Sequence, residues 1–281
     1  MTILVTGGTG NIGRHLVDHL HRGGTPFRVM ARRPSDVLPP GTAFHQGDLT
    51  DPPSLAAALS DGVDRVFLLW PSLSPHGIQG VVAALRQAEV RHVVYVSAMQ
   101  VTDDNRRTIG VWGSVEQAVV DAGLGHTFLR VSGLATNTLG WAPAIRAGEP
   151  VRIPYPMAKR SLIHEADIAA VAAVALTDSG HTARSHVLTG PGVISQAEQV
   201  AAIAAATGRP VNYVDQDPGE ARAAIAEWAE PEWADQALAY WASLVDHPEP
   251  VTRTVEEVLG RPARSFGQWA ADHAGDFTAP A

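Results

Sequence analysis

Three glycines near the start of the chain have the spacing of a phosphate-binding turn. Gly7, Gly10 and Gly13 form a G-x-x-G-x-x-G pattern directly after the short β-branched run 3–6. In such a turn the first glycine allows a tight bend, the second lets backbone N–H groups approach a pyrophosphate, and the third lets a helix pack closely on the strand. Apolar residues at helical spacing follow over 12–20. This strand–turn–helix context predicts a dinucleotide site; the alternative is a glycine-rich turn without a ligand.

The charge after the second predicted strand indicates which dinucleotide is bound. The strand covers 27–31 and is followed by Arg32 and Arg33, where an acidic residue is often found. An acid at this point accepts the ribose 2′-hydroxyl of NAD, whereas an arginine suits the 2′-phosphate of NADP. The sequence therefore predicts NADP(H) as the preferred cofactor and NAD(H) as the alternative. The competing interpretation of Arg32 is a solvated loop side chain.

Composition excludes several other kinds of chemistry. The 281 residues carry a formal net charge of −8 and include no cysteine. The acidic balance argues against nucleic-acid binding, and the lack of cysteine removes disulfides and thiolate metal sites. No His/Asp/Glu cluster has metal-ligand spacing, and no apolar run approaches the ~18 residues of a membrane span. We expect a cytoplasmic protein with no metal, no nucleic-acid partner and no membrane association.

Strands and helices alternate along the first two thirds of the chain. This order predicts an α/β fold, a doubly wound parallel Rossmann sheet with a smaller, mostly helical C-terminal substrate lobe. We expect the core at 1–134 and 160–190 and the lobe at 135–159 and 191–281. Asp51 and Ser195 are predicted to cap helices. The further strands are expected at 43–46, 63–70, 93–97, 127–131 and 187–189, and the lobe is expected to hold a helix over 137–147 and two or three helices in its tail.

The motifs together resemble the NmrA-like branch of the atypical short-chain dehydrogenases/reductases. The matching pieces are VTGGTGNIGRHLVDHL, GDLTDP, VFLLWP, VVYVSA, TFLRV, IHEADIAAVAAVAL and RPARSFGQWAADH. They cover nearly the whole chain in order. Members range from reductases to redox-sensing regulators that bind the cofactor without turnover.

The resemblance implies roles for individual residues along the cofactor. For Asp48 the alternative is a helix cap or a turn former, and for Leu69 and Trp70 it is core packing. The implied set is Gly7, Thr9, Gly10, Asn11 and Ile12 at the pyrophosphate, Arg32 with Arg33 at the 2′-phosphate, Asp48 and Leu49 at the adenine, Leu69, Trp70 and Pro71 at the ribose and nicotinamide, and Ser97 near the position of the superfamily's catalytic serine.

The usual proton-donating pair of the superfamily is missing from its place. Typical members carry Tyr-x-x-x-Lys on the helix after the fifth strand, where the i, i+4 spacing puts both side chains on one face. Between Ser97 and Arg130 this chain has neither tyrosine nor lysine, and the nearest echo is Trp112-x-x-x-Glu116.

A Tyr-x-x-x-Lys does occur later in the chain. Tyr155 and Lys159 lie after the sixth strand, where Pro154 and Pro156 favour a loop, so we predict that they do not form a dyad. The candidate catalytic residues are Ser97, Tyr155 acting alone, and His164, with His76 weaker. The alternative for His164 is a structural histidine ahead of a helix that Asp167 caps.

A hydride site without a dedicated acid favours acceptors whose reduced form is a weak base. Quinones and other electron-poor conjugated molecules fit this requirement. We expect a small aromatic or quinone-like substrate and an NAD(P)H-dependent oxidoreductase, with a place in aromatic polyketide tailoring implied by the resemblance. The alternative is a non-catalytic regulator that binds a protein partner; the sequence assigns no oligomeric state. The predicted substrate pocket comprises Trp70, Met99, Trp112, Asn137 and Tyr155.

Overall fold

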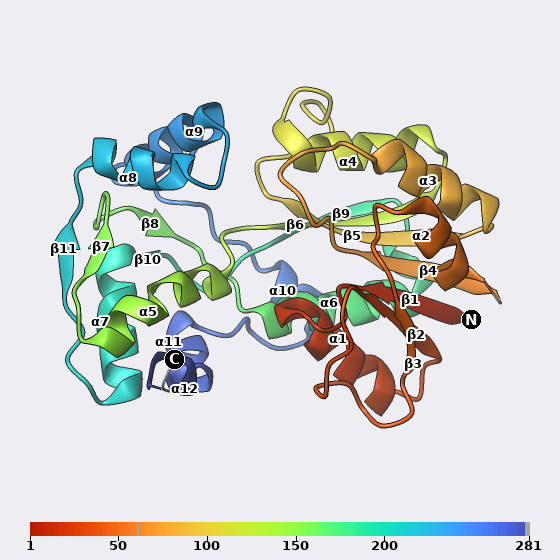
Figure 1. The fold of residues 1–281 in the computed structure, drawn as a ribbon, viewed down its shortest axis with the longest axis horizontal. Coiled ribbons are helices and arrows are strands. Elements are labelled where there is room, and N and C mark those ends of the chain that lie inside the picture. The colour runs from red at the N-terminus through yellow and green to blue at the C-terminus, as the bar shows by residue number, and fades with distance from the viewer. Residues whose placement is uncertain (61, 279–281) are drawn as a thin grey trace. The chain divides into compact units, whose positions relative to one another are not determined.

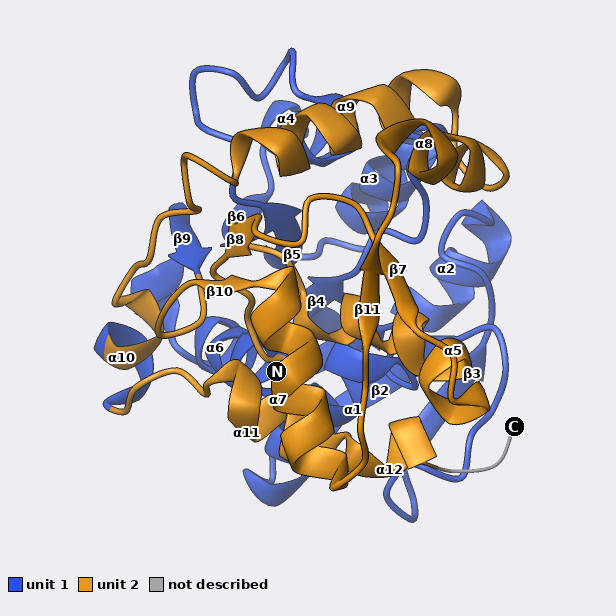
Figure 2. Cartoon of the chain, turned by 90° about the vertical axis from the view of Figure 1, so that its left-hand side faces the viewer, with its two compact units in different colours: residues 1–131, 165–188, 257–260 blue, residues 132–164, 189–256, 261–281 orange. Residues whose placement is uncertain are grey.

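The computed structural model describes residues 1–60 and 62–278, which form two compact units. The first unit comprises 1–131, 165–188 and 257–260, and the second comprises 132–164, 189–256 and the described residues from 261 onward (Figure 2). Each unit has its own apolar core.

A seven-stranded, wholly parallel sheet forms the centre of the first unit (Figure 1). Its order β3-β2-β1-β4-β5-β6-β9 starts with the 3-2-1-4-5-6 arrangement of a Rossmann sheet, which confirms the predicted doubly wound α/β fold. The strands are β1 (Thr2–Thr6), β2 (Phe27–Ala31), β3 (Ala43–Gln46), β4 (Val63–Leu68), β5 (His92–Ala98), β6 (Gly125–Val131) and β9 (Arg184–Leu188).

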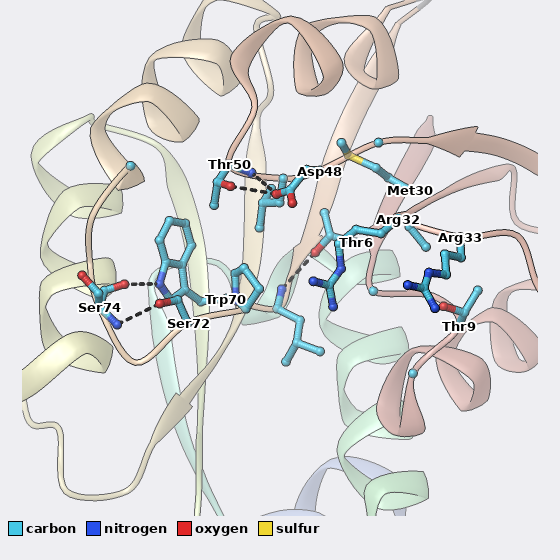
Figure 3. A pocket seen from close by; sticks show the side chains of 18 of the residues that line it. Thr6, Thr9, Met30, Arg32, Arg33, Asp48, Thr50, Trp70, Ser72 and Ser74 are labelled. Carbon is cyan, nitrogen blue, oxygen red and sulfur yellow. Dashed lines mark hydrogen bonds between the residues drawn. The ribbon is translucent and has the colours of Figure 1, made fainter. Parts of the chain in front are cut away.

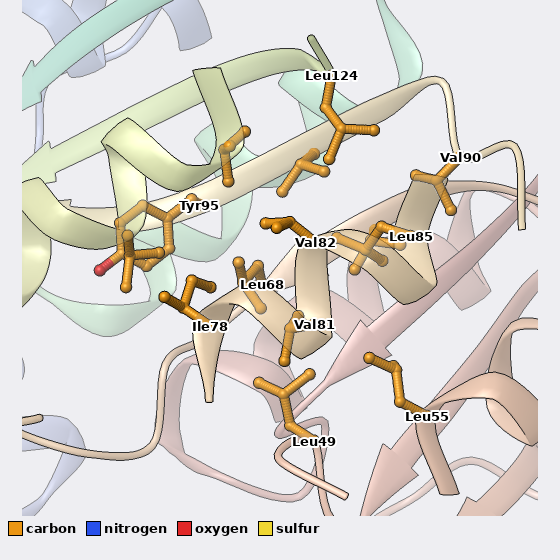
Figure 4. Packing of buried hydrophobic residues seen from close by; sticks show 14 of the residues in the cluster. Leu49, Leu55, Leu68, Ile78, Val81, Val82, Leu85, Val90, Tyr95 and Leu124 are labelled. Carbon is orange, nitrogen blue, oxygen red and sulfur yellow. The ribbon is translucent and has the colours of Figure 1, made fainter. Parts of the chain in front are cut away.

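Helices cover both faces of this sheet. On one face α1 packs against α6, and the other face is covered by α2, α3 and α4 (Figure 1). Leucine and valine side chains from the latter helices meet alternate residues of β4 and β5 in one core cluster, with Tyr95 at one end of it (Figure 4). The helices are α1 (Asn11–Arg22), α2 (Pro52–Leu59), α3 (Ile78–Gln87), α4 (Gly110–Asp121) and α6 (Glu165–Thr177), with the short 3₁₀ helix η2 (Ser179–His181).

The fourth strand is shorter than predicted. It ends at Leu68 rather than at Trp70, because the backbone N–H of Leu69 donates to the Thr6 hydroxyl (3.0 Å) instead of continuing the ladder. The same hydroxyl donates to the Phe67 carbonyl (2.9 Å). Thr6 therefore joins the carboxyl ends of β1 and β4 and turns the next residues away from the sheet.

The second unit contains two small sheets and several helices. β7 pairs with β11 in parallel and β8 with β10 antiparallel. In the described residues its elements are η1 (Ala135–Trp141), α5 (Ala142–Ala147), β7 (Val151–Ile153), β8 (Lys159–Arg160), β10 (Ile194–Ser195), α7 (Gln196–Thr207), β11 (Tyr213–Asp215), α8 (Pro218–Ala226), α9 (Pro231–Ser243), α11 (Phe266–Asp272) and α12 (Ala274–Thr278), while α10 (Thr254–Leu259) contributes residues to both units.

Three local predictions, two in the second unit and one in α6 of the first, are wrong. The single helix expected over 137–147 is a 3₁₀ helix followed by α5, because Pro143 has no N–H to continue an α-helical ladder. Up to residue 278, the last that the structure describes, five helices follow α7 where two or three were expected, since Pro218 and Pro231 each start a new one. Asp167 lies inside the first turn of α6, which begins at Glu165, and is not its cap.

The boundary of the first unit differs from the expected core by a few residues. Segments 132–134 and 160–164 bond to each other within the second unit: the Ser132 hydroxyl donates to the Ser161 carbonyl (2.5 Å), and Leu134 forms a bridge with Ile163. These bonds group the two segments with the second unit.

Candidate functional site

The glycine turn has the geometry that its spacing predicts. Gly7 has φ +65°, and its N–H donates to the Met30 carbonyl (3.0 Å) at the end of β2. A Cβ at Gly13 would lie 2.1 Å from the Gly7 carbonyl oxygen, so only glycine fits there. Gly10 precedes α1 and offers no side chain to cap it, which leaves the first-turn N–H groups of this twelve-residue helix for an anion.

A cavity of about 1320 Å³ opens at the carboxyl ends of β1 to β4, within the first unit. This volume exceeds the roughly 300–1000 Å³ of sites that bury a drug-sized molecule, as an extended dinucleotide requires. The lining residues are Thr6, Gly7, Thr9, Gly10, Met30, Ala31, Arg32, Arg33, Gly47, Asp48, Leu49, Thr50, Leu69, Trp70, Pro71, Ser72, Ser74, His76 and Gly77.

Ten of the predicted cofactor residues line this cavity, and three do not. Asn11 is the exposed first residue of α1, Ile12 is buried beneath it, and Ser97 is buried at the end of β5. The loop 72–77 also contributes to the lining of the cavity, which was not predicted from the sequence. Gly77 (φ +91°) just ahead of α3 was the available signal that this loop turns back toward the strand ends.

Two cations and one fixed carboxylate line the cavity. Arg32 and Arg33 are exposed at its rim, directly after β2 (Figure 3). Asp48 accepts hydrogen bonds from the backbone N–H (2.9 Å) and hydroxyl (2.7 Å) of Thr50. These bonds lower the pKa of Asp48, and the nearby Arg32 charge lowers it further. The carboxylate is therefore an ionised acceptor at neutral pH.

Trp70 forms a flat, fixed wall of the same cavity. Its indole N–H donates to the Ser74 carbonyl (2.8 Å), and the Ser74 N–H donates to the Ser72 hydroxyl (3.0 Å) (Figure 3). The His76 N–H donates to the Ser74 hydroxyl (3.2 Å), which also holds the loop. The ring also packs against the core cluster of the first unit. Both earlier interpretations of Trp70, cavity wall and core packing, therefore apply.

The end of β5 carries a buried hydroxyl group that lacks a hydrogen-bond partner in the described residues. The Ser97 hydroxyl, in a residue only 1% exposed, has no hydrogen-bond partner among the residues that the structure describes. An unpaired buried hydroxyl is costly unless a ligand or water completes it. The glycine turn and the two arginines at the cavity rim are residues that fit a nicotinamide dinucleotide.

The position of the usual Tyr-x-x-x-Lys holds Trp112 and Glu116 on α4. Trp112 is half-buried against the core cluster. Glu116 is fully buried and accepts from Arg130 (Nε–Oε1 3.0 Å, Nη2–Oε2 2.8 Å) and from Arg106 (3.1 Å). The carboxylate is thereby neutralised by two guanidinium groups. Met99 follows β5, and its N–H donates to the Val131 carbonyl (2.9 Å).

Two further catalytic candidates, Tyr155 and His164, belong to the second unit, whereas His76 lines the cavity of the first. Tyr155 lies in a loop with φ +53°, and Lys159 lies in β8, so the segment is not helical, as predicted. Tyr155 packs against the α8–α9 cluster. His164 is 3% exposed and its Nε2 lies 3.2 Å from the Asp272 carboxylate, an ion-pair partner that fits a structural histidine. Asn137 is exposed on η1.

Two kinds of site are not found in the described part of the chain. No group of three or more His, Asp or Glu side chains there is placed to hold a metal ion. No helix of those residues is long and apolar enough to cross a membrane.

Comparison with known proteins identifies the family. A family model described as NAD(P)H-binding matches residues 7–179, more than half of the chain. The chain therefore belongs to the NAD(P)H-binding family, and the resemblance to NmrA-like atypical short-chain dehydrogenases/reductases is confirmed.

Two relatives align over nearly their whole length. The (4-alkanoyl-5-oxo-2,5-dihydrofuran-3-yl)methyl phosphate reductase of Streptomyces griseus is 37% identical over 280 residues, covering 98% of this chain and 99% of the relative. The NAD(P)H azoreductase of Xenophilus azovorans is 37% identical over 286 residues, covering 99% of each. With the family match, these relatives show that the chain is an NAD(P)H-dependent oxidoreductase.

Solved structures reproduce the fold at lower identity. The NADPH-dependent quinone oxidoreductase QOR2 of Escherichia coli, complexed with NADPH, superposes with a TM-score of 0.77 at 21% identity, covering 96% of this chain and 99% of that one. The triphenylmethane reductase of Citrobacter sp. complexed with NADP(H) gives 0.76 at 19%, covering 98% and 100%. At these identities the likeness concerns the fold alone.

Proposed function

We propose that this oxidoreductase reduces small, electron-poor conjugated molecules, such as quinones, azo compounds or enones, at the expense of NADPH. One observation carries the proposal: the segment between Ser97 and Arg130, which holds the catalytic pair of typical relatives, contains neither tyrosine nor lysine. The cofactor supplies a hydride when it is bound. The question for the chain is then which acceptors its residues can serve.

Reduction of an ordinary ketone produces a strongly basic alkoxide, which needs a positioned acid. Such acids contribute about 10²–10⁴ in rate. The side chains present at this segment do not replace one: the Trp112 indole is a donor that does not release its proton, and the Glu116 carboxylate is engaged by Arg106 and Arg130. A reduced quinone, azo or enone acceptor spreads its charge over a conjugated system, so that solvent can protonate it.

The names of the relatives agree with this restriction. One acts on an oxo-dihydrofuran bearing an alkanoyl group, a second on azo compounds, and a third, 24% identical over 246 residues, is named quinone oxidoreductase 2. The shared chemistry of these acceptors is a conjugated, electron-poor double bond. The flat wall that Trp70 offers to the cavity suits such planar molecules.

A preference for NADPH over NADH is part of the proposal. It rests on Arg32 and Arg33 at the rim of the cavity, where the 2′-phosphate of a bound dinucleotide would find two cations and no acid directly after β2.

The test is a set of steady-state assays that follow NADPH oxidation with one naphthoquinone, one azo dye, one enone lactone and one aliphatic ketone. We expect turnover of the conjugated acceptors and a ketone rate lower by about 10² or more. A ketone rate equal to the quinone rate would refute the proposal and point to an acid elsewhere, with Tyr155→Phe and His164→Asn as the first variants to make.

Tight NADPH binding without oxidation by any acceptor would favour the remaining alternative, a redox-sensing regulator with a protein partner. A place in aromatic polyketide tailoring stays a prediction, and the products formed from a polycyclic quinone in air would test it.

A further inference from the structure

A buried ionic network lies at the carboxyl end of the sheet, outside the cofactor cavity. Glu116, which is fully buried on α4, binds both Arg130 of β6 and Arg106 of the preceding loop. Arg130 and Arg106 each also donate to one carboxylate oxygen of Asp103, at 2.7 and 2.5 Å. Two positive and two negative groups therefore balance. Losing Glu116 or Arg130, the two most buried members, would leave the opposite buried charge with fewer partners, which is unfavourable.

The network fastens the loop between β5 and α4, residues 99–109. Asp103 and Arg106 belong to this loop, whereas Glu116 and Arg130 belong to the regular elements beneath it. Inside the loop, Asn105 accepts from the Thr102 N–H (2.7 Å) and donates to the Gln100 carbonyl (2.9 Å). The loop is thus bonded both to itself and to the sheet, as a fixed wall would be.

The fastened loop begins where the reaction is expected. In the β5–β6 ladder Ser97 is the direct register partner of Arg130, and Met99 follows two residues later with its N–H on the Val131 carbonyl. The strand end with the unpaired Ser97 hydroxyl and the predicted acceptor-pocket residue Met99 are therefore held by the strand that carries the central arginine of the network.

We infer that Asp103, Arg106, Glu116 and Arg130 are positioning residues, which fix the β5–α4 loop and thereby place Ser97 and Met99 for the acceptor. Glu116 stands four residues after Trp112, the place at which typical relatives carry the lysine of their catalytic pair. In this chain the position anchors a wall of the acceptor site. The inference rests on the proposed function in so far as it assigns the acceptor to this end of the sheet.

The network should govern the acceptor and leave the cofactor unaffected. The cavity that fits NADPH is lined by residues 6–10, 30–33, 47–50 and 69–77, none of which belongs to the network. Misplacing reacting groups by about 1 Å can cost as much as 10² in rate. A loosened loop is therefore expected to lower kcat/KM for the acceptor and to keep the dissociation constant of NADPH.

Asp103 offers the cleanest perturbation, because its side chain is 73% exposed and its loss does not empty the core. Its neighbour Asp104 is exposed and outside the network, so that Asp104→Ala is a matched control. We expect Asp103→Ala to lower kcat/KM for a naphthoquinone about tenfold or more, with NADPH affinity changed by less than about twofold. Asp103→Asn retains one acceptor oxygen and should fall between the wild type and the alanine variant. Asp104→Ala should match the wild type.

A second measurement is independent of turnover. Arg106 and Arg107 are trypsin sites within the loop, so limited digestion followed by mass spectrometry reports its opening. Asp103→Ala should speed cleavage after these residues, and Asp104→Ala should not. Unchanged cleavage together with unchanged kcat/KM in Asp103→Ala would overturn the inference, whether or not the variant is less stable than the wild type.

The two measurements also separate this inference from the proposed function. If the wild type reduces no acceptor, the proposed function fails, and the digestion still decides whether the network holds the loop. If the wild type reduces quinones and Asp103→Ala weakens NADPH as strongly as it slows acceptor turnover, the network acts on the whole unit and the positioning role is refuted.

Discussion

Replacing Arg32 by alanine should weaken NADPH binding selectively. Arg32 follows β2 at the rim of the cavity, on the same wall as the glycine turn. A charge-assisted guanidinium–phosphate contact contributes about 1.5–3 kcal/mol. The Arg32 side chain is exposed to solvent, and its charge already interacts with the nearby Asp48 carboxylate. We therefore expect a loss just below this range, about 1.4 kcal/mol, which is about tenfold in the dissociation constant.

The assay is a fluorescence titration of wild type and variant with NADPH and with NADH. NADH lacks the 2′-phosphate, so its dissociation constant should change by less than about twofold. Arg33→Ala should give a smaller selective loss. Arg86→Ala removes an exposed charge on α3, outside the cavity, and should leave both titrations unchanged. Equal weakening of NADPH and NADH in Arg32→Ala would show that this residue does not contact the phosphate.

Three further predictions concern the proton donor, the stability and the turn. Lys159→Ala should change the maximal rate by less than about tenfold, because the residue lies in a strand and not on a helix beside Tyr155; a thousandfold loss with intact folding would contradict this. Burial lowers the pKa of His92 and of His186 to about 4, so below pH 6.5 the unfolded chain binds protons that the native state does not. Urea unfolding should therefore show the free energy of unfolding falling as the pH drops from about 6.5 to about 4, and the fall should be shallower in His186→Gln. Gly13→Ala puts a Cβ 2.1 Å from a carbonyl oxygen of the glycine turn and should weaken NADPH binding about tenfold or more. Gly140→Ala, with open space around its Cβ, should match the wild type in the same titration.

The cofactor end of the molecule could be predicted because its determinants are consecutive in the chain. The glycine turn, the strand before it and the helix after it lie within the first 22 residues and form the expected unit. Helix starts were equally local: Asp51 accepts from the Ser54 N–H (3.2 Å), and Ser195 forms a full capping box with Glu198.

The lining of the cavity depended on contacts that periodicity does not encode. The apolar run 66–69 continues past the strand, which is why β4 was predicted to reach Trp70. It stops at Leu68 because a hydroxyl more than 60 residues earlier, on Thr6, takes the next N–H. The residues after Leu68 then leave the sheet and form the loop that lines the cavity, a consequence of one side-chain bond between distant segments.

The acceptor end of the molecule shows why a missing motif is informative only together with what replaces it. The sequence analysis treated Trp112 and Glu116 as an echo in which neither side chain could perform acid catalysis. The structure keeps the i, i+4 relation on α4 and pairs Glu116 with Arg130, fourteen residues later and on a neighbouring strand. Because Arg106 and Arg130 bind the Glu116 carboxylate, this side chain is placed to hold the loop and not to donate a proton to an acceptor. Under the proposed function, the absence of the dyad restricts the acceptor chemistry. Under the inferred role of the network, Glu116 and its arginines supply the rigidity that such an acceptor needs, since alignment is then the main contribution left to the protein.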